Sequence, residues 1–149
     1  MINQNLLKYN VSMIKKIIIG IILLFVLSCI CSTFNIDKAT TYVTEHAEKK
    51  SKCCCAWYVM RAMQDGGCYV GIYPAWMYRY ILPMYGFDSV PTKDYKAEKG
   101  DIIVIENSKE HVWGHIAMYN GGQWVSDFKQ KSMNPYRKKY NYIIFRHLS

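Results

Sequence analysis

The sequence predicts an α+β fold in which helices come first and an antiparallel sheet follows. Two stretches, residues 36–49 and 54–63, carry apolar residues at helical spacing. Short runs rich in β-branched and aromatic residues follow, and glycine-containing turns separate them. The chain has 149 residues, of which 51% are hydrophobic and 20% charged, so its size and composition are those of one folded domain.

Two helices are expected in the first half of the chain. The first covers residues 36–49, and Asn35 or Asp37 is available to cap its N-terminus. The second begins around Cys54. Gly66-Gly67 ends it, because glycine readily adopts the backbone conformation that closes a helix.

The second half of the chain predicts the sheet. Pro74 suits the first turn of a short helix and Pro83 its end. Gly100-Asp101 then opens a β-branched run, and Asn120-Gly121-Gly122 forms a hairpin turn. The four expected strands cover residues 102–105, 115–119, 124–128 and 140–146.

Residues 1–32 have the pattern of an export signal. The first half of this segment contains three lysines, Lys8, Lys15 and Lys16. The apolar run that follows, residues 17–26, is short of the roughly 20 residues that a membrane span needs. Val26-Leu27-Ser28-Cys29 resembles a bacterial lipobox, in which Cys29 would carry lipid; cleavage near Cys31 is the alternative. We expect an exported protein of the periplasm or cell envelope, with a signal peptide, lipoprotein signal or membrane anchor at residues 1–32.

The charge balance argues against nucleic acid as a partner. The chain has 19 basic and 11 acidic residues, a net charge of +8, and setting aside the three N-terminal lysines leaves +5 for residues 33–149. The remaining basic residues lie in short runs, such as Lys49-Lys50-Ser51-Lys52 and Arg137-Lys138-Lys139. A nucleic-acid binder concentrates charge along a helix or among exposed aromatic residues. Solvated faces, or attraction to an anionic wall polymer or lipid surface, explain these runs better.

Three residues form a candidate catalytic site. Cys55 lies at the expected start of the second helix, where the helix dipole and free N–H groups favour a thiolate and lower its pKa. His115 opens a strand, and Asp127 follows twelve residues later across the hairpin turn. An even spacing lets both side chains point to the same face. An imidazole held by a carboxylate beside a cysteine is an arrangement that activates a nucleophile.

Two other classes of function are considered. The first is a zinc site, although adjacent cysteines do not readily reach one tetrahedral ion and no Cys-x2-Cys pair is present. The ligands available to it are Cys53, Cys54, Cys55, Cys68, His111 and His115. The second is a non-catalytic envelope-binding lipoprotein of the same fold. Cys54 also stays open as the nucleophile, and Cys53, Cys54 and Cys68 are expected to be packing or incidental thiols.

The chain resembles the NlpC-type and CHAP cysteine amidases and peptidases, papain-like enzymes that cut peptidoglycan. The resemblance lies in Cys55-Ala56-Trp57-Tyr58-Val59, Lys99-Gly100-Asp101-Ile102-Ile103-Val104 and Gly114-His115-Ile116-Ala117-Met118-Tyr119. It is closer still to the amidase effectors of bacterial type VI secretion systems. The same order of motifs recurs there, including Gly66-Gly67, Trp124-Val125-Ser126-Asp127-Phe128 and Tyr136-Arg137. The resemblance spans about residues 36–146.

This resemblance implies a papain-like cysteine amidase domain at residues 33–149 that hydrolyses an amide bond in peptidoglycan. It makes Cys55 the nucleophile, His115 the general base and Asp127 the residue that orients His115. No metal or organic cofactor is implied, and the implied partners are peptidoglycan and a cognate immunity or inhibitor protein. Type VI effectors normally lack their own export signal, so their delivery route is not carried over to this chain.

Overall fold

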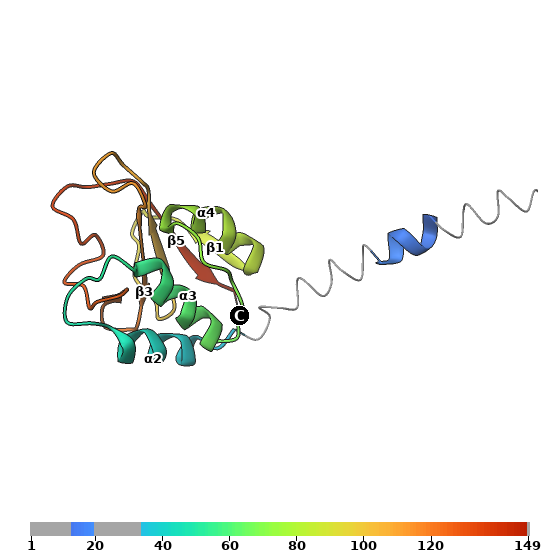
Figure 1. Ribbon diagram of the computed structural model, residues 1–149, viewed down its shortest axis with the longest axis horizontal. Helices are drawn as coiled ribbons and strands as arrows, with labels where there is room; N and C mark the ends of the chain where they lie inside the picture. The colour runs from blue at the N-terminus through green and yellow to red at the C-terminus, as the bar shows by residue number, and fades with distance from the viewer. Residues whose placement is uncertain (1–12, 20–33, 149) are drawn as a thin grey trace, which may run out of the picture.

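The computed structural model describes residues 13–19 and 34–148 (Figure 1). Residues 13–19 are helical. Most of the expected signal segment lies outside the described residues, including Cys29, Cys31 and the lipobox-like stretch. Among the described helices, none has the length and apolar character needed to cross a membrane.

A five-stranded antiparallel sheet forms the centre of the domain. Its strand order is β1-β5-β2-β3-β4. The strands are β1 (Phe87–Val90), β2 (Ile102–Ile105), β3 (His115–Tyr119), β4 (Trp124–Val125) and β5 (Tyr142–His147). Strands β2, β3 and β4 follow one another as a meander, and β5 then crosses over to pair between β1 and β2. The sequence predicted the meander but neither β1 nor the position of β5 inside the sheet.

Two helices, α2 (Ile36–His46) and α3 (Cys55–Asp65), pack against each other, and α3 lies on β3 (Figure 1). The side chain of Asn35 accepts a hydrogen bond from the Lys38 backbone N–H at 2.9 Å, which confirms one of the two expected caps of α2. Gly66 closes α3, as predicted. Three short helical turns follow: η1 (Ala75–Met77), α4 (Tyr78–Ile81) and η2 (Leu82–Tyr85).

The sheet has an apolar cluster on each face. Ile102 and Val104 join the helices in the larger cluster, whereas Ile103 and Ile105 belong to a smaller cluster covered by loop residues such as Tyr136. Strand β2 is therefore buried on both faces, which explains its unbroken β-branched sequence. Residues 36–148 thus form one α+β domain, as the sequence predicted.

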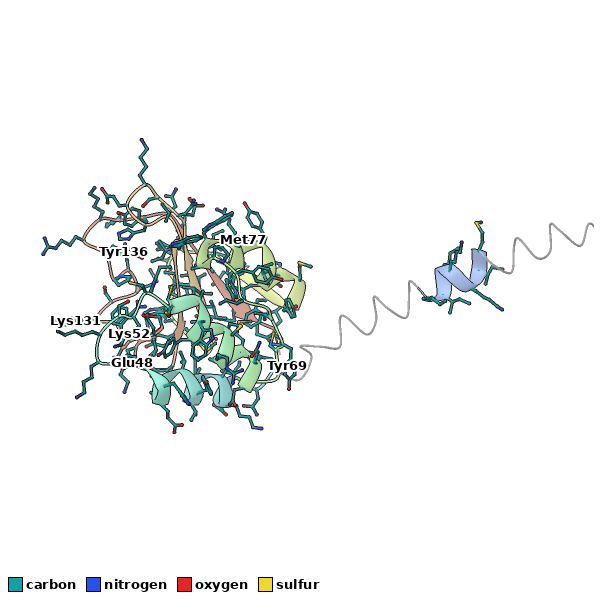
Figure 2. All side chains as sticks on the ribbon, viewed as in Figure 1. Glu48, Lys52, Tyr69, Met77, Lys131 and Tyr136 are labelled. Carbon is teal, nitrogen blue, oxygen red and sulfur yellow. The ribbon has the colours of Figure 1, made fainter. Side chains whose placement is uncertain are left out.

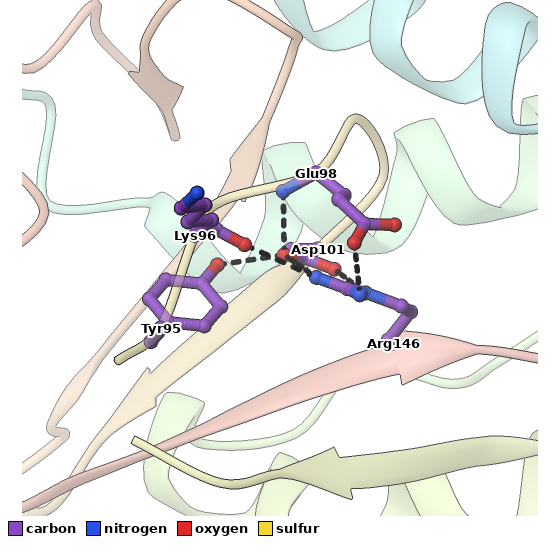
Figure 3. A network of polar contacts seen from close by, with 5 residues as sticks. All are labelled: Tyr95, Lys96, Glu98, Asp101 and Arg146. Atoms are coloured by element: carbon purple, nitrogen blue, oxygen red, sulfur yellow. Dashed lines mark hydrogen bonds and ion pairs between the residues drawn. The ribbon is translucent and has the colours of Figure 1, made fainter. Parts of the chain in front are cut away.

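Asp101 anchors the segment that leads into β2 (Figure 3). Its fully buried carboxylate accepts hydrogen bonds from Arg146 Nε on β5 at 2.7 Å and from the Tyr95 hydroxyl at 2.6 Å. It also accepts one from the Glu98 backbone N–H at 2.8 Å. The hydrogen bond to the Asp101 carboxylate is the main cause that raises the pKa of Arg146. Burial is the main cause that raises the pKa of Tyr95, and the hydrogen bond to Asp101 adds to it. The Gly-Asp pair that opens this strand thus serves to join β5 to the preceding loop.

Two local expectations were wrong. The strand expected over residues 124–128 ends at Val125, because the Ser126 backbone N–H donates to the Phe128 carbonyl at 3.0 Å and the chain turns back. Pro83 does not end a helix: it lies at the start of the 3-10 turn η2. The short strand β4 changes where Asp127 lies, with consequences for the candidate site.

The cysteines fall into two groups. Cys53, Cys54 and Cys55 are free thiols, the first two of them exposed. Cys68 is fully buried and disulfide-bonded, so the expectation that it is an incidental thiol was wrong. Because Cys53 and Cys54 are free, neither of them pairs with Cys68.

Candidate active site

Cys55 is the first residue of α3, and its sulfur lies against strand β3. The thiol is largely buried and receives hydrogen bonds from the backbone of Ile116 on β3 and of Ala56 in its own helix. The residue two positions earlier, Cys53, has a left-handed backbone conformation with φ of 57°, which a non-glycine residue adopts at an energetic cost. Cys53 lies in the exposed segment that leads into α3.

Burial dominates the titration of Cys55. The pKa of the thiol is raised to about 11, chiefly by burial and to a smaller extent by the negative charge of Asp127, and the two backbone hydrogen bonds only partly oppose this rise. The expectation that the helix start would lower this pKa was therefore wrong in direction, because loss of hydration outweighs the helix N–H groups. At neutral pH the sulfur is a protonated thiol that needs a base to activate it.

His115 is the first residue of β3, and the glycine before it explains its position. Gly114 has φ of +64°, and a Cβ atom there would lie 2.5 Å from the Ile105 carbonyl oxygen. Only glycine lets the chain approach β2 this closely. The His115 ring packs against Tyr136, with ring centroids 5.8 Å apart, and only 5% of the residue is exposed.

Burial lowers the pKa of His115 to about 4. The charge of Asp127 raises this pKa, and His111 lowers it, but both act less strongly than desolvation. The imidazole is consequently neutral at pH 7 and has a lone pair with which to accept a proton. Neutral thiol and neutral imidazole are thus the resting forms of the two groups.

Cys55 and His115 line the same cavity, which has a volume of about 320 Å³. Its other lining residues come from the loop before α3, the loop before β3 and the segment before β5: Ser51, Cys53, Glu110, His111, Val112, Trp113, Gly114 and Tyr136. The structure therefore brings together two of the three residues predicted from the sequence, around a space that a substrate group can enter.

Asp127 is close by but makes different contacts from those expected. Its Oδ2 atom accepts hydrogen bonds from the Ser51 hydroxyl at 3.0 Å and from the backbone N–H groups of Lys52 at 2.5 Å and Cys54 at 3.3 Å. Oδ1 accepts from the Ser126 hydroxyl at 3.0 Å. No hydrogen bond joins it to His115 among the described residues. Asp127 instead holds the segment that leads into α3, and its charge reaches His115 through space.

Gln130 contacts His115 directly, and sequence reasoning missed it. Its Nε2 atom lies 2.7 Å from Nε2 of His115 and 3.1 Å from the Ser126 hydroxyl oxygen, and only 3% of the residue is exposed. The turn after Val125 brings it there, because the Gln130 backbone N–H donates to the Trp124 carbonyl at 2.9 Å. No periodicity marks this turn, although a glutamine three residues after Asp127 was the available signal.

A second cavity, of about 400 Å³, is also lined by Cys55. Its walls carry exposed aromatic side chains, with Trp57, Tyr73 and Trp113 being 47%, 39% and 69% exposed. Trp113 and Cys55 line both cavities. Cys55 therefore shares one cavity with His115 and the other with exposed aromatic side chains.

The residues considered for zinc are not arranged as a metal site. Throughout residues 13–19 and 34–148, no three of the His, Cys, Asp and Glu side chains are grouped so that they could hold a metal ion. His111 instead stacks on Tyr136, with ring centroids 3.8 Å apart.

The fold is shared with a solved structure. No protein-family model and no curated protein sequence matches the chain. The crystal structure of the type VI native effector-immunity complex Tae3-Tai3 from Ralstonia pickettii contains a chain that is 31% identical, with a TM-score of 0.71. The likeness covers 77% of this chain and 100% of that one. This chain belongs to the Tae3 family.

A second crystal structure agrees with the first. The selenomethionine form of the Tae3-Tai3 complex from Ralstonia pickettii is 32% identical to this chain, with a TM-score of 0.67. The match covers 72% of this chain and 98% of the solved one. The Tae3 family is thus represented by a protein from an effector-immunity complex, in agreement with the type VI resemblance of the sequence motifs.

Proposed function

We propose that the chain is a peptidoglycan amidase, a cysteine hydrolase that cleaves an amide bond in the stem peptides or cross-links of the cell wall. The observation that carries the proposal is the shared cavity of Cys55 and His115, in which the residue after His115 hydrogen-bonds the sulfur. Membership of the Tae3 family supports it, because Tae3 effectors are peptidoglycan amidases. In this proposal the fold is of the papain-like NlpC and CHAP class.

The first half of the reaction forms a thioester. His115 takes the proton of the Cys55 thiol as the sulfur attacks the peptide carbonyl carbon, and a C–S bond forms. The backbone hydrogen bonds of Ile116 and Ala56 offset the cost of developing negative charge on sulfur. The backbone N–H of Cys55 at the start of α3 is the donor we assign to the oxyanion. The C–N bond then breaks, and His115 returns its proton to the leaving amine.

The second half restores the enzyme. A water molecule loses a proton to His115, its oxygen attacks the thioester carbonyl carbon, and the C–S bond breaks to release a carboxylic acid, which then gives up its own proton to solvent. The proton returns from His115 to the sulfur of Cys55. Both groups start and finish the cycle neutral, and no proposed step draws on a metal or an organic cofactor.

Two polar residues support this pair. Gln130 fixes the His115 ring, and its buried Oε1 atom makes no hydrogen bond among the described residues. Half a turn of the amide group lets this oxygen accept a hydrogen bond from Nε2–H of His115, which leaves the lone pair of the neutral ring on Nδ1, where it can take the proton of Cys55. Asp127 fixes the segment before Cys55 and favours the imidazolium through its charge.

The proposed location is the periplasm or cell envelope, reached through residues 1–32 as a signal peptide, lipoprotein signal or anchor with lipid on Cys29. The disulfide bond of Cys68 supports an oxidising compartment. The solved Tae3-Tai3 complex supports the proposal of a cognate immunity protein for this chain. Mass spectrometry of the envelope fraction tests the lipid: an acylated N-terminal Cys29 is the result that the lipoprotein form of the proposal requires.

Digestion of purified peptidoglycan sacculi tests the activity. The protein is incubated with sacculi, and the soluble products are separated and identified by mass spectrometry. We expect stem-peptide fragments with a newly formed carboxylate and a newly formed amine, which also identifies the bond. Intact sacculi after prolonged incubation with folded protein would contradict the proposal.

A further inference from the structure

Two lysine-bearing segments lie side by side next to the active site. The chain after α2 forms a parallel bridge between Glu48 and Phe128, and the Glu48 backbone N–H donates to the Asp127 carbonyl at 2.8 Å. This pairing brings the lysines that follow Glu48 beside those that flank Gln130. Figure 2 shows Lys52 and Lys131 at the same end of the molecule as Glu48.

A cavity of about 400 Å³ separates these segments, and we call it the lysine cleft. Its lining residues are Lys49, Lys50, Ser51, Phe128, Lys129, Lys131, Ser132 and Pro135. Four of the eight are exposed lysines, and none is acidic. Two acids are adjacent to the cleft in sequence, and neither lines it: Glu48 accepts a hydrogen bond from the Tyr58 hydroxyl, and Asp127 is fully buried and accepts from the Ser51 hydroxyl. Among the described residues, none of the four lysines has an ion-pair partner.

The lysine cleft continues into the active site. Ser51 lines both the cleft and the cavity that contains Cys55 and His115. Its hydroxyl donates to Asp127, the same carboxylate that accepts from the backbone of Cys54. One carboxylate thus fixes the segment that both cavities share.

We propose that the lysine cleft binds the carboxylates of the peptidoglycan stem peptide and so holds an acidic peptide across Cys55. This inference rests on the proposed function and names the part of the substrate that is recognised. Four like charges around one cavity repel each other, and an anion placed among them relieves that repulsion. The half-buried Phe128 and Pro135 add an apolar surface for the peptide's aliphatic side chains.

Binding is measured without catalysis, in a Cys55→Ala background, with a pair of synthetic stem peptides that carry free carboxylates or carboxamides. The test variant is Lys49→Glu/Lys129→Glu. The matched control is Lys93→Glu/Lys96→Glu, which reverses two exposed lysines outside the cleft. Thermal melting confirms that each variant is folded.

We expect the parent to prefer the carboxylate peptide by at least about tenfold and to lose this preference as salt rises. The test variant should bind the carboxylate peptide at least about tenfold more weakly, whereas the control stays within about twofold of the parent. In the protein that retains Cys55, the Lys49→Glu/Lys129→Glu substitutions should raise KM for sacculi and leave kcat within about twofold, because they weaken substrate binding and do not change the reacting groups.

Equal binding of the two peptides by the parent, or unchanged binding by the folded test variant, overturns the proposal. The proposal is also overturned if the test variant loses binding to vesicles of anionic phospholipid but keeps binding to the carboxylate peptide. That result would show that the cleft contacts a membrane. If carboxylate binding behaves as expected and sacculi stay intact, the cleft assignment stands and the amidase proposal fails.

Discussion

The side-chain amide of Gln130 lies 2.7 Å from Nε2 of His115, and both residues are buried. A neutral amide and not the expected carboxylate therefore contacts the His115 ring. A carboxylate in that position would favour the imidazolium strongly, whereas the amide orients the ring with little effect on its charge. In the proposed reaction, the ring of His115 therefore stays neutral until it takes the proton of Cys55.

Substitution of Gln130 separates orientation from charge. Gln130→Ala should lower kcat by at least about tenfold, since a base that is free to rotate is less often aligned. Gln130→Glu should keep the ring oriented but raise the pKa of His115, so that the acidic limb of the kcat/KM profile moves to higher pH. The pH dependence of sacculus digestion by the two variants checks both statements. Unchanged profiles in both would show that Gln130 does not act on His115.

The stability of the fold should depend on pH through His115. Its pKa is about 4 in the folded protein, below the ordinary value of 6.5, so the unfolded chain binds the proton more readily. Stability from this residue is complete above pH 6.5 and is lost as the pH falls towards 4, by about 3 kcal/mol in total. Urea unfolding of the parent and of His115→Gln measures the difference. The gap between their pH curves should open in this window, and parallel curves would contradict the assignment.

Gly114 should tolerate no side chain. In Gly114→Ala the new Cβ would lie 2.5 Å from the Ile105 carbonyl oxygen, so β3 has to shift away from β2. We expect a loss of about 1–3 kcal/mol in the free energy of unfolding and a fall in kcat, because His115 moves with the strand. Gly121→Ala is the control at another positive φ, where the closest contact is 3.7 Å to a lysine side chain. A loss of kcat in the control that equals that in Gly114→Ala would argue against the close approach.

Asp127 should act mainly on the segment before α3. Asp127→Asn replaces one carboxylate oxygen by an NH2 group, so either the three donors on Oδ2 (Ser51, Lys52 and Cys54) or the Ser126 hydroxyl on Oδ1 lose their acceptor. The expected cost is about 1–3 kcal/mol of stability, with activity reduced but still measurable. Chemical denaturation measures the loss of stability, and digestion of sacculi measures the loss of activity. Complete loss of activity at unchanged stability would restore Asp127 as the partner of His115.

The sequence was sufficient to predict the elements that carry Cys55 and His115. Asn35 and Gly66 mark helix ends by local chemistry, and the β-branched run of β2 is visible because both of its faces are buried. These signals are local, and periodicity or capping reveals them.

The rest depended on tertiary contacts. Asp127 follows His115 by twelve residues, but the turn at Ser126 interrupts the alternation of side chains along the strand. Asp127 therefore makes no hydrogen bond to His115 among the described residues, and the Gln130 side chain contacts the ring instead. The pKa of Cys55 likewise follows from burial against β3, and the helix start alone gives the opposite direction. Neither effect is visible as a periodic pattern in the sequence.

The most direct test of the account is the initial rate of fragment release from sacculi by Cys55→Ala and, as its neighbour control, Cys54→Ala. Cys54 is an exposed free thiol one residue away, so the pair isolates the position of the nucleophile. The account predicts a fall of at least about ten-thousandfold for Cys55→Ala and a rate within about threefold of the parent for Cys54→Ala. A Cys55→Ala protein that digests sacculi at the parent rate, or a Cys54→Ala protein that does not digest them, would contradict it.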